Sequence, residues 1–248
     1  MKISAAIITY NEERNIARAI ESLRCCEEIV VVDSGSTDRT VELARNLDAR
    51  VIDTHWRGYA AQKNFAAEQC THDWVLSVDA DEALSEALEA EIWQLKKSGA
   101  AHVAYTMPRL AQYLGRWIFH CGWYPDRKVR LFDRRKASWQ GDYVHESVKV
   151  DGSLGHFEEN LLHFTCDSLS EHLKTMDRYT TLAAAELIDA KRVPNWIHMV
   201  FDPLWTFLKT YFIKRGFLDG YEGLAIAYMA AHYNFLKYAK ARFMSPRR

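Results

Sequence analysis

The chain has 248 residues, of which 48% are hydrophobic and 26% are charged, and its formal net charge is −1. This length fits one large α/β domain, or one domain with an appendage, and the composition excludes wholesale disorder. We expect no signal peptide, because the N-terminus has one Lys and only a short apolar run, Ile3 to Ile8, before polar residues. We expect no membrane-spanning helix, because no run of about 18 apolar residues occurs. The five cysteines form no C-x-x-C pair, which favours reduced thiols in a cytoplasmic protein.

Strand and helix patterns alternate along the first third of the chain. The apolar run from Ile3 to Ile8 predicts a strand, and apolar residues then repeat at helical spacing from Ile16 to Leu23. The runs EIVVVD, ARVIDTH and WVLSVDAD predict three more strands, separated by helical segments. Strands separated by helices of this length predict a parallel sheet with right-handed crossovers.

Polar side chains follow three of the predicted strands at the point where each strand ends. They occupy residues 9–12, 33–38 and 79–81. Because ligands of open α/β sheets bind outside the carboxyl ends of the strands, these segments predict one site at one edge of the sheet.

Asp79 and Asp81 admit two interpretations. A D-x-D at the end of a strand can hold Mg²⁺ or Mn²⁺, which completes its coordination shell with substrate phosphates. Alternatively, Asp81 and Glu82 would favour the N-terminus of a helix expected directly after them. A phosphatase motif is disfavoured, because residue 83 is alanine and the motif follows the fourth strand.

Four motifs in a fixed order favour the first interpretation. The segments ITYNEERNI, IVVVDSGSTDRT, QKN and VLSVDADE together resemble the GT-A domain of family 2 glycosyltransferases. The resemblance implies an α/β fold, with a Rossmann-like mixed sheet flanked by helices, that binds a nucleotide sugar and Mg²⁺ or Mn²⁺. By that resemblance, the nucleotide-sugar-binding residues are Thr9, Tyr10, Asn11, Glu12, Asp33, Lys63, Asn64, Asp79, Ala80 and Asp81.

The segment 114–148 is rich in tryptophan, arginine and histidine. Besides core packing, this composition suits a wall for a sugar acceptor and the diphosphate, and the candidates are Trp123, Tyr124, Arg127, Arg130 and His145. The stretch resembles the non-processive bacterial members of the family that build the lipopolysaccharide inner core. That resemblance implies glucose transfer from UDP-glucose to a heptose. A polymerising synthase is disfavoured, because QYLGRW departs from the Q-x-x-R-W motif of those enzymes.

Inverting transfer requires a base that deprotonates the acceptor hydroxyl. Glu146 in YVHESV is the candidate, because it follows a short strand and the family's HE falls here; an exposed strand acid is the structural alternative. Asp126 and Asp142 are lesser candidates. His163 in NLLHFT is either a core residue or a third metal ligand beside Asp79 and Asp81.

Functions from two other classes stay open. A nucleotidyltransferase or phosphohydrolase could use the same acidic edge, although the first strand is followed by no Gly-rich phosphate loop. A non-catalytic, membrane-bound nucleotide-sugar binder would leave Glu146 without a purpose. Nucleic-acid binding is disfavoured, because the basic residues of the tail are diluted among aliphatic ones.

We expect a GT-A domain over residues 1–165, with a nucleotide-sugar half (1–100) and an acceptor half (101–165), followed by an amphipathic helical region over 166–248. Residues 194–248 hold eight Lys or Arg against three Asp or Glu, and Pro203 suits the first turn of a helix. Apolar stripes with basic flanks predict a peripheral protein on the cytoplasmic face of the inner membrane; packing as ordinary core is the alternative. The basic residues expected to meet anionic lipid are Lys237, Lys240, Arg242, Arg247 and Arg248.

Overall fold

The computed structural model describes residues 1–141, 146–192 and 194–244. The chain forms two compact units, and each of them combines two segments of the chain. The first unit contains Met1–Leu110 and Asp126–Phe164, and the second contains Ala111–Pro125 and Thr165–Arg248. The segment Ala111–Pro125, expected in the first domain, thus groups with the C-terminal region.

The first unit is built on a mixed sheet. Its parallel part has the order β3-β2-β1-β4 and consists of β1 (Ile3–Thr9), β2 (Glu28–Asp33), β3 (Arg50–Asp53) and β4 (Trp74–Asp79). The sheet continues in the order β8-β6-β12-β5, through β8 (Asp126–Asp133), β6 (Ala104–Tyr113), β12 (Leu161–Cys166) and β5 (Glu82–Leu84). Further pairings join β11 (Leu154–His156) to β6, and β9 (Ala137–Gln140) to β10 (Ser147–Val150). The last residues of β6, which belong to the second unit, pair with β7 (Arg116–Ile118).

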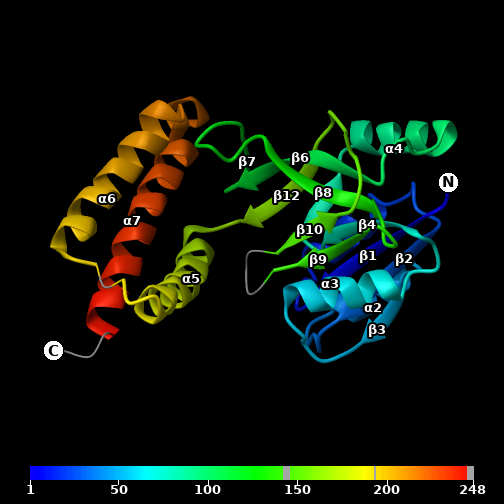
Figure 1. Cartoon of the computed structure of the whole chain (residues 1–248), viewed down its shortest axis with the longest axis horizontal. Helices are drawn as coiled ribbons and strands as arrows, with labels where there is room; N and C mark the ends of the chain where they lie inside the picture. The colour runs from blue at the N-terminus through cyan, green and yellow to red at the C-terminus, as the bar shows by residue number, and fades with distance from the viewer. Residues whose placement is uncertain (142–145, 193, 245–248) are drawn as a thin grey trace. The chain divides into compact units, whose positions relative to one another are not determined.

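Helices cover both faces of the parallel strands (Figure 1). They are α1 (Ile16–Glu21), α2 (Thr40–Asn46), α3 (Tyr59–Glu68) and α4 (Glu86–Ser98). Alternate residues of β1 serve the two faces: Ile3 and Ile7 pack in one buried cluster with α1, α2 and α4, whereas Ala6 packs in another with α3. The strands are therefore buried on both sides, as expected of a parallel sheet.

The register of the sheet brings the predicted polar segments to one edge. Thr9, the last residue of β1, pairs with Asp33, the last residue of β2. On the other side of β1, Ile8 pairs with Asp79 at the end of β4. The predicted parallel sheet and the common edge for the three segments are both confirmed.

The second unit is mainly helical. Its elements are α5 (Leu169–Asp189), α6 (Trp196–Leu208), the π-helical turn η1 (Lys209–Ile213), the 3-10 turn η2 (Gly216–Asp219) and α7 (Gly220–Met244). The Asn195 side chain caps α6 by accepting hydrogen bonds from the amides of Ile197 and His198. Pro203 is the eighth residue of α6, so its expected place in the first turn is wrong. Among the described residues, every helix is too short or too polar to cross a membrane.

The basic residues near the end of α7 have different surroundings. The Nζ atom of Lys240 lies 2.6 Å from the Asp177 carboxylate and 2.9 Å from the hydroxyls of Thr180 and Thr181 on α5. Burial lowers the pKa of Lys237, which is half-buried. Lys240 therefore joins α7 to α5. The sequence led us to expect that this residue is free to contact lipid, and it is not. Arg247 and Arg248 lie outside the described residues.

Candidate active site

Lys63 connects two carboxylates that lie far apart in the sequence. Helix α3 places this side chain in the interior of the first unit, where only 3% of it is exposed. Its Nζ atom lies 2.8 Å from Oδ1 of Asp79 and 3.1 Å from Oε1 of Glu146. It also lies over the ring of Trp139, 4.4 Å from the centroid. The candidate base is thus held beside the first acid of the D-x-D.

Arg130 holds the other oxygen of Asp79. Its Nη2 atom donates to Oδ2 of Asp79 at 2.8 Å and to Oε1 of Glu82 at 2.7 Å, and its Nε atom donates to Oε2 of Glu82. The side chain of Arg130 is 4% exposed and that of Glu82 is fully buried. Glu82 also accepts a hydrogen bond from the backbone amide of Asp79 at 3.1 Å. Arg130 therefore positions the D-x-D from inside the protein. The sequence led us to expect a solvent-facing residue of a substrate wall, which Arg130 is not.

Two cations keep Asp79 ionised. Burial alone would raise its pKa, but the charges of Arg130 and Lys63 outweigh this effect and hold the pKa well below its usual range. Conversely, burial would lower the pKa of Arg130, but Glu82 and Asp79 raise it. Since both oxygens of Asp79 already contact cations, this residue is poorly placed to hold a metal ion.

Asp81 and His163 form a second pair at the same edge. Oδ2 of Asp81 lies 3.2 Å from Nε2 of His163, and the backbone of the next residue, Phe164, donates to the carbonyl of Asp81. Octahedral Mg²⁺ or Mn²⁺ has bonds of about 2.1 Å, so adjacent ligands lie about 3.0 Å apart. The pair fits two neighbouring positions of such an ion. Within the described part of the chain, no group of three or more His, Cys, Asp or Glu is arranged to hold a metal without further ligands.

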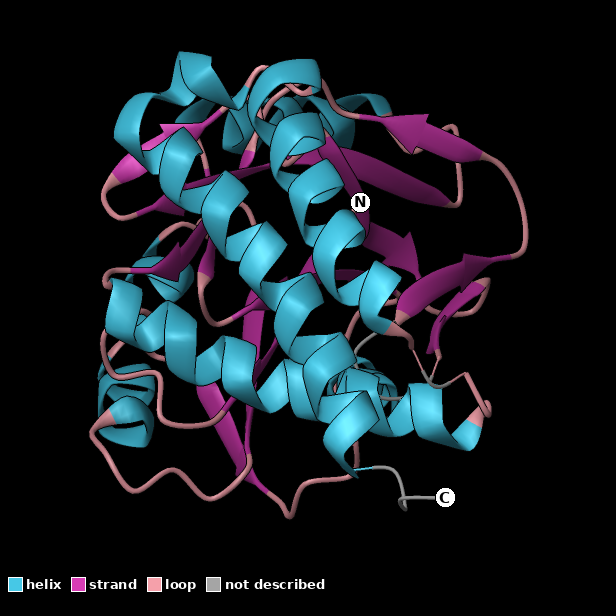
Figure 2. Ribbon diagram, turned by 90° about the vertical axis from the view of Figure 1, so that its left-hand side faces the viewer, coloured by secondary structure: helices cyan, strands magenta, loops and turns pink. Residues whose placement is uncertain are grey.

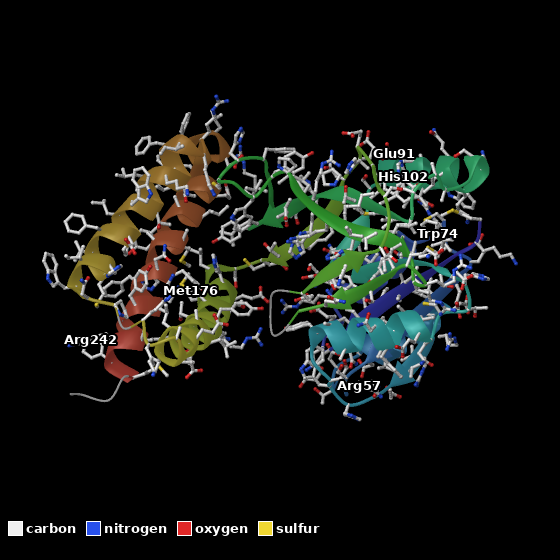
Figure 3. All side chains as sticks on the ribbon, viewed as in Figure 1. Arg57, Trp74, Glu91, His102, Met176 and Arg242 are labelled. Atoms are coloured by element: carbon white, nitrogen blue, oxygen red, sulfur yellow. The ribbon has the colours of Figure 1, made fainter. Side chains whose placement is uncertain are left out.

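The helix interpretation of the D-x-D does not match the structure. Strand β5 follows Asp81 directly, and α4 begins only at Glu86, where Ser85 caps it through the amide of Leu88. The acids of the motif therefore do not stabilise a helix N-terminus. In Figure 3 the label of Trp74 marks the amino end of β4, and the site lies at the other end of this strand.

The loops after β1 and β2 are bonded to each other. The Asn11 amide donates to the Ser36 hydroxyl at 2.8 Å, and the Asn11 side chain accepts from the Thr37 amide at 2.8 Å. Asp33 is buried and accepts from the amides of Gly35 and Ser36 and from the Ser36 hydroxyl. Asp33 thus fixes the turn of residues 34–36, and Ser36 of this turn bonds to Asn11 of the predicted nucleotide-sugar loop.

Other predicted residues of the first loop have mixed exposure. Tyr10 presents 57% of its surface, whereas Thr9 is buried, and Glu12 accepts from the Asn15 side chain at 2.8 Å. Ala80 is buried between the two acids of the D-x-D.

Three buried polar atoms have no hydrogen-bond partner among the described residues: Thr9 Oγ1, Gln62 Oε1 and Trp139 Nε1. Thr9 ends β1, and Gln62 donates its amide to Ser34, just after β2. Trp139 contacts Lys63. Because buried polar groups are nearly always paired, unpaired ones at a strand edge favour a polar ligand there.

A family model described as Glycosyl transferase family 2 matches residues 4–146. The chain belongs to this family. A "Lipopolysaccharide core biosynthesis glycosyltransferase LpsC" of Rhizobium meliloti is 35% identical to it over 97% of this chain and 92% of the relative. An uncharacterized glycosyltransferase of Rickettsia typhi is 34% identical over 98% of this chain and 88% of the relative. A solved structure, "Crystal Structure of a Mycobacterial Protein", matches 75% of this chain and 73% of its own, at 16% identity and a TM-score of 0.50, and thus shares the fold.

These findings confirm the family, the fold class and the enzyme class expected from the sequence. In this family 2 glycosyltransferase, Asp79 of the D-x-D forms a cluster with Lys63 and Glu146, whereas Asp81 contacts His163. Asn64 has another role: it exchanges two hydrogen bonds of 2.9 Å with the backbone of Trp139, which ties α3 to β9.

The residues named for the expected acceptor wall are divided between the two units, and the wall stays a prediction. Arg127 donates to the Phe157 carbonyl and to Glu158, in the loop before β12. Trp123 and Tyr124 belong to the second unit, where their rings contact Tyr113 and Phe119 respectively. His145, and Asp142 among the lesser base candidates, lie outside the described residues.

Asp126 is paired with Arg109 at 2.6 Å and with Lys128 at 3.0 Å. Burial alone would raise the pKa of Asp126, but Arg109 and Lys128 have the larger effect and lower it. This lowered pKa disfavours Asp126 as a base.

Sequence reasoning missed Glu82 and Gln62. Glu82 belongs to the quoted motif, but its full burial under Arg130 depends on β8, whose pairing with β4 leaves no local pattern in the sequence. Gln62 precedes Lys63 on α3, and its neighbours in the QKN motif were the available signal.

Proposed function

We propose that this glycosyltransferase is an inverting enzyme that transfers a hexose, with glucose from UDP-glucose as the first candidate, to a heptose of the lipopolysaccharide inner core. The name of the Rhizobium meliloti relative supports the lipopolysaccharide acceptor. The observation that carries the proposal is the shared lysine: Lys63 joins Glu146 to Asp79, so that a proton acceptor lies beside the group expected at the donor diphosphate.

In the proposed reaction, Glu146 takes the proton of the acceptor hydroxyl. The hydroxyl oxygen then forms a bond to the anomeric carbon, and the bond from that carbon to the diphosphate oxygen breaks, which releases UDP. Lys63 compensates the charge of Glu146 in the absence of substrate, and the burial of Lys63 limits the screening of this pair by water. General-base catalysis of this kind contributes on the order of 10²- to 10⁴-fold.

Asp81 and His163 are the residues that would hold Mg²⁺ or Mn²⁺. When bound, the ion neutralises charge on the departing diphosphate. Asp79, whose oxygens are taken by Lys63 and Arg130, would orient the site and contact the ribose. This division of the D-x-D differs from the expectation that both acids are metal ligands.

Two other functions are weighed against this one. A glycosyltransferase for another lipid-linked or surface glycan, using a different nucleotide sugar, would need the same cluster and differ only in its specificity. A non-catalytic nucleotide-sugar binder would have no use for Glu146 beside Lys63. We place the enzyme on the cytoplasmic face of the inner membrane, as a peripheral protein, because its proposed acceptor is anchored in lipid.

The metal assignment is tested by titrating Mn²⁺ into the protein in the presence of UDP, with calorimetry as the readout. Asp81→Asn and His163→Ala should each weaken Mn²⁺ binding by about tenfold or more. His156→Ala, a histidine of β11 that contacts Thr106, is the matched control and should bind as the wild type does. Equal Mn²⁺ affinity in all variants, or full transfer activity in excess chelator, would exclude this metal site.

A further inference from the structure

Helix α6 contacts its neighbour α7 through several polar side chains. Thr206 accepts a hydrogen bond from the Asn234 side chain of α7 at 2.7 Å, and the rings of His198 and Tyr238 lie 5.9 Å apart. Burial and a hydrogen bond to Asp202 raise the pKa of Tyr238 to about 12. His198, Asp202 and Thr206 of α6 are spaced four residues apart, so they lie along one side of the helix. The side of α6 that faces α7 therefore carries polar residues beside the partly buried Met199 and Phe207.

Most of the large apolar residues of α6 lie on its other side and are exposed. Seven large ones expose between 39% and 68% of their surface, and none of the helix is buried in the structure described. They are Trp196, Ile197, Val200, Phe201, Leu204, Trp205 and Leu208. Figure 2 shows α6 beside α7, and the sticks in Figure 3 show side chains that project from α6 away from α7. A contiguous apolar stripe of this kind marks a surface that something covers.

Basic residues lie at both ends of this stripe. Lys191 and Arg192 precede α6, and Lys209, Lys214 and Arg215 follow it, all of them exposed. Between residues 191 and 218 the only acidic residue is Asp202, on the side that faces α7. The flanks of the exposed stripe are therefore positive at both ends.

This charge distribution distinguishes between possible occupants. A second copy of the chain that paired through α6 would bring basic flanks against basic flanks, in a parallel or an antiparallel arrangement, and like charges in contact are unfavourable. An anionic lipid surface instead supplies phosphates for the flanks and an apolar layer for the stripe. Thirteen residues of helix extend about 20 Å, which is short of the roughly 30 Å of a bilayer core, so the helix must lie in the plane of the membrane.

We propose that α6 lies in the interface of an anionic membrane, with its exposed stripe inserted and its two basic flanks on the lipid phosphates. Trp196 and Trp205, at the two ends of the stripe, then occupy the interfacial level that tryptophan favours. The proposal deepens the membrane location given under the proposed function, on which it rests. It places the contact on α6, because Lys240 at the end of α7 is bonded to α5.

The test is binding of the purified full-length protein to vesicles of phosphatidylcholine with and without phosphatidylglycerol, measured by flotation. Trp205→Ser should reduce the partition coefficient by about tenfold, and the added change Phe201→Ser by about tenfold more. Lys209→Gln and Arg192→Gln should each reduce it by about fivefold, at low salt only. Trp93→Ser is the matched control, because it removes an exposed tryptophan from α4 of the first unit.

Each variant is also melted and sedimented. Substitutions of exposed side chains should leave the melting temperature unchanged, so that lost binding is not lost folding. Binding of the wild type that ignores phosphatidylglycerol, or a Trp205→Ser variant that binds as Trp93→Ser does, would overturn the proposal. So would a wild-type dimer that Trp205→Ser converts to monomer, since the stripe would then be covered by a second copy. UDP release with a water-soluble acceptor, unaffected by Trp205→Ser, separates this surface from the transferase reaction.

Discussion

Replacing Arg130 by methionine should destabilise the protein more than the same replacement of an exposed arginine on β8. The substitution keeps most of the apolar stem but leaves the fully buried carboxylate of Glu82 with Arg109, at 3.4 Å, as its only cationic partner among the described residues. Removing one member of a buried ion pair costs about 3–5 kcal/mol. For a chain of this size, each kcal/mol lowers the melting temperature by about 2–4 °C, so we expect a fall of about 6–20 °C.

Arg127→Met is the matched control on β8. Its side chain is 36% exposed and its partner Glu158 is 76% exposed, so this pair contributes about 1 kcal/mol or less, or under about 4 °C. The assay is thermal unfolding followed by circular dichroism at neutral pH. The double variant Glu82→Gln/Arg130→Met should be more stable than Arg130→Met alone, because it removes the unpaired charge. If Arg130→Met melts no lower than Arg127→Met, the buried cluster does not hold the D-x-D in place.

Three further predictions concern the base, the nucleoside loop and acid stability. Glu146→Gln should preserve donor binding and lower the transfer rate by about a hundredfold or more; a rate within a few-fold of wild type would exclude Glu146 as the base. Asp33→Ala should raise the donor KM, because the turn of residues 34–36 loses three hydrogen bonds; an unchanged KM would show that this turn does not contact the donor. Burial would raise the pKa of Glu28, but hydrogen bonds from Thr71, Arg50 and Ser4 lower it from 4.5 to about 2. Glu28 therefore stabilises the fold above pH 4.5, and this contribution is lost as the pH falls toward 2. Glu28→Gln should accordingly melt below the wild type at pH 7 and approach it near pH 2; a difference that is independent of pH would contradict the assignment.

The parallel half of the fold follows from local patterns. Each of its strands is a short apolar run, and each run ends at polar residues that the parallel register then places at one edge, as Thr9, Asp33 and Asp79 show. The contacts between those segments depend on long-range pairing instead. Lys63 and Glu146 are 83 residues apart, and their meeting requires β9 and α3 to pack together through Asn64.

Charge patterns were the weakest guide. Arg130 lies in a basic stretch that suggested a surface for phosphates. On β8, however, its side chain points into the interior and contacts Asp79 at the end of β4, the strand that pairs with β8. Lys240 belongs to a basic tail, but α5 supplies it with a carboxylate. The helical spacing of α6 was visible, but the spacing does not tell which side of a helix meets its neighbour. That choice depends on Asn234 and Tyr238, more than 25 residues further along the chain.

Sugar transfer itself tests the proposed function most directly. The protein is incubated with UDP-, GDP- and ADP-linked hexoses and with lipopolysaccharide whose core ends at the inner heptose, and label in the lipopolysaccharide and released nucleotide are both measured. The account predicts label and UDP in equal amounts from a UDP-hexose, UDP-glucose first, with almost none from the Glu146→Gln variant. Nucleotide-sugar binding without transfer to any acceptor, or equal transfer by Glu146→Gln, would contradict it.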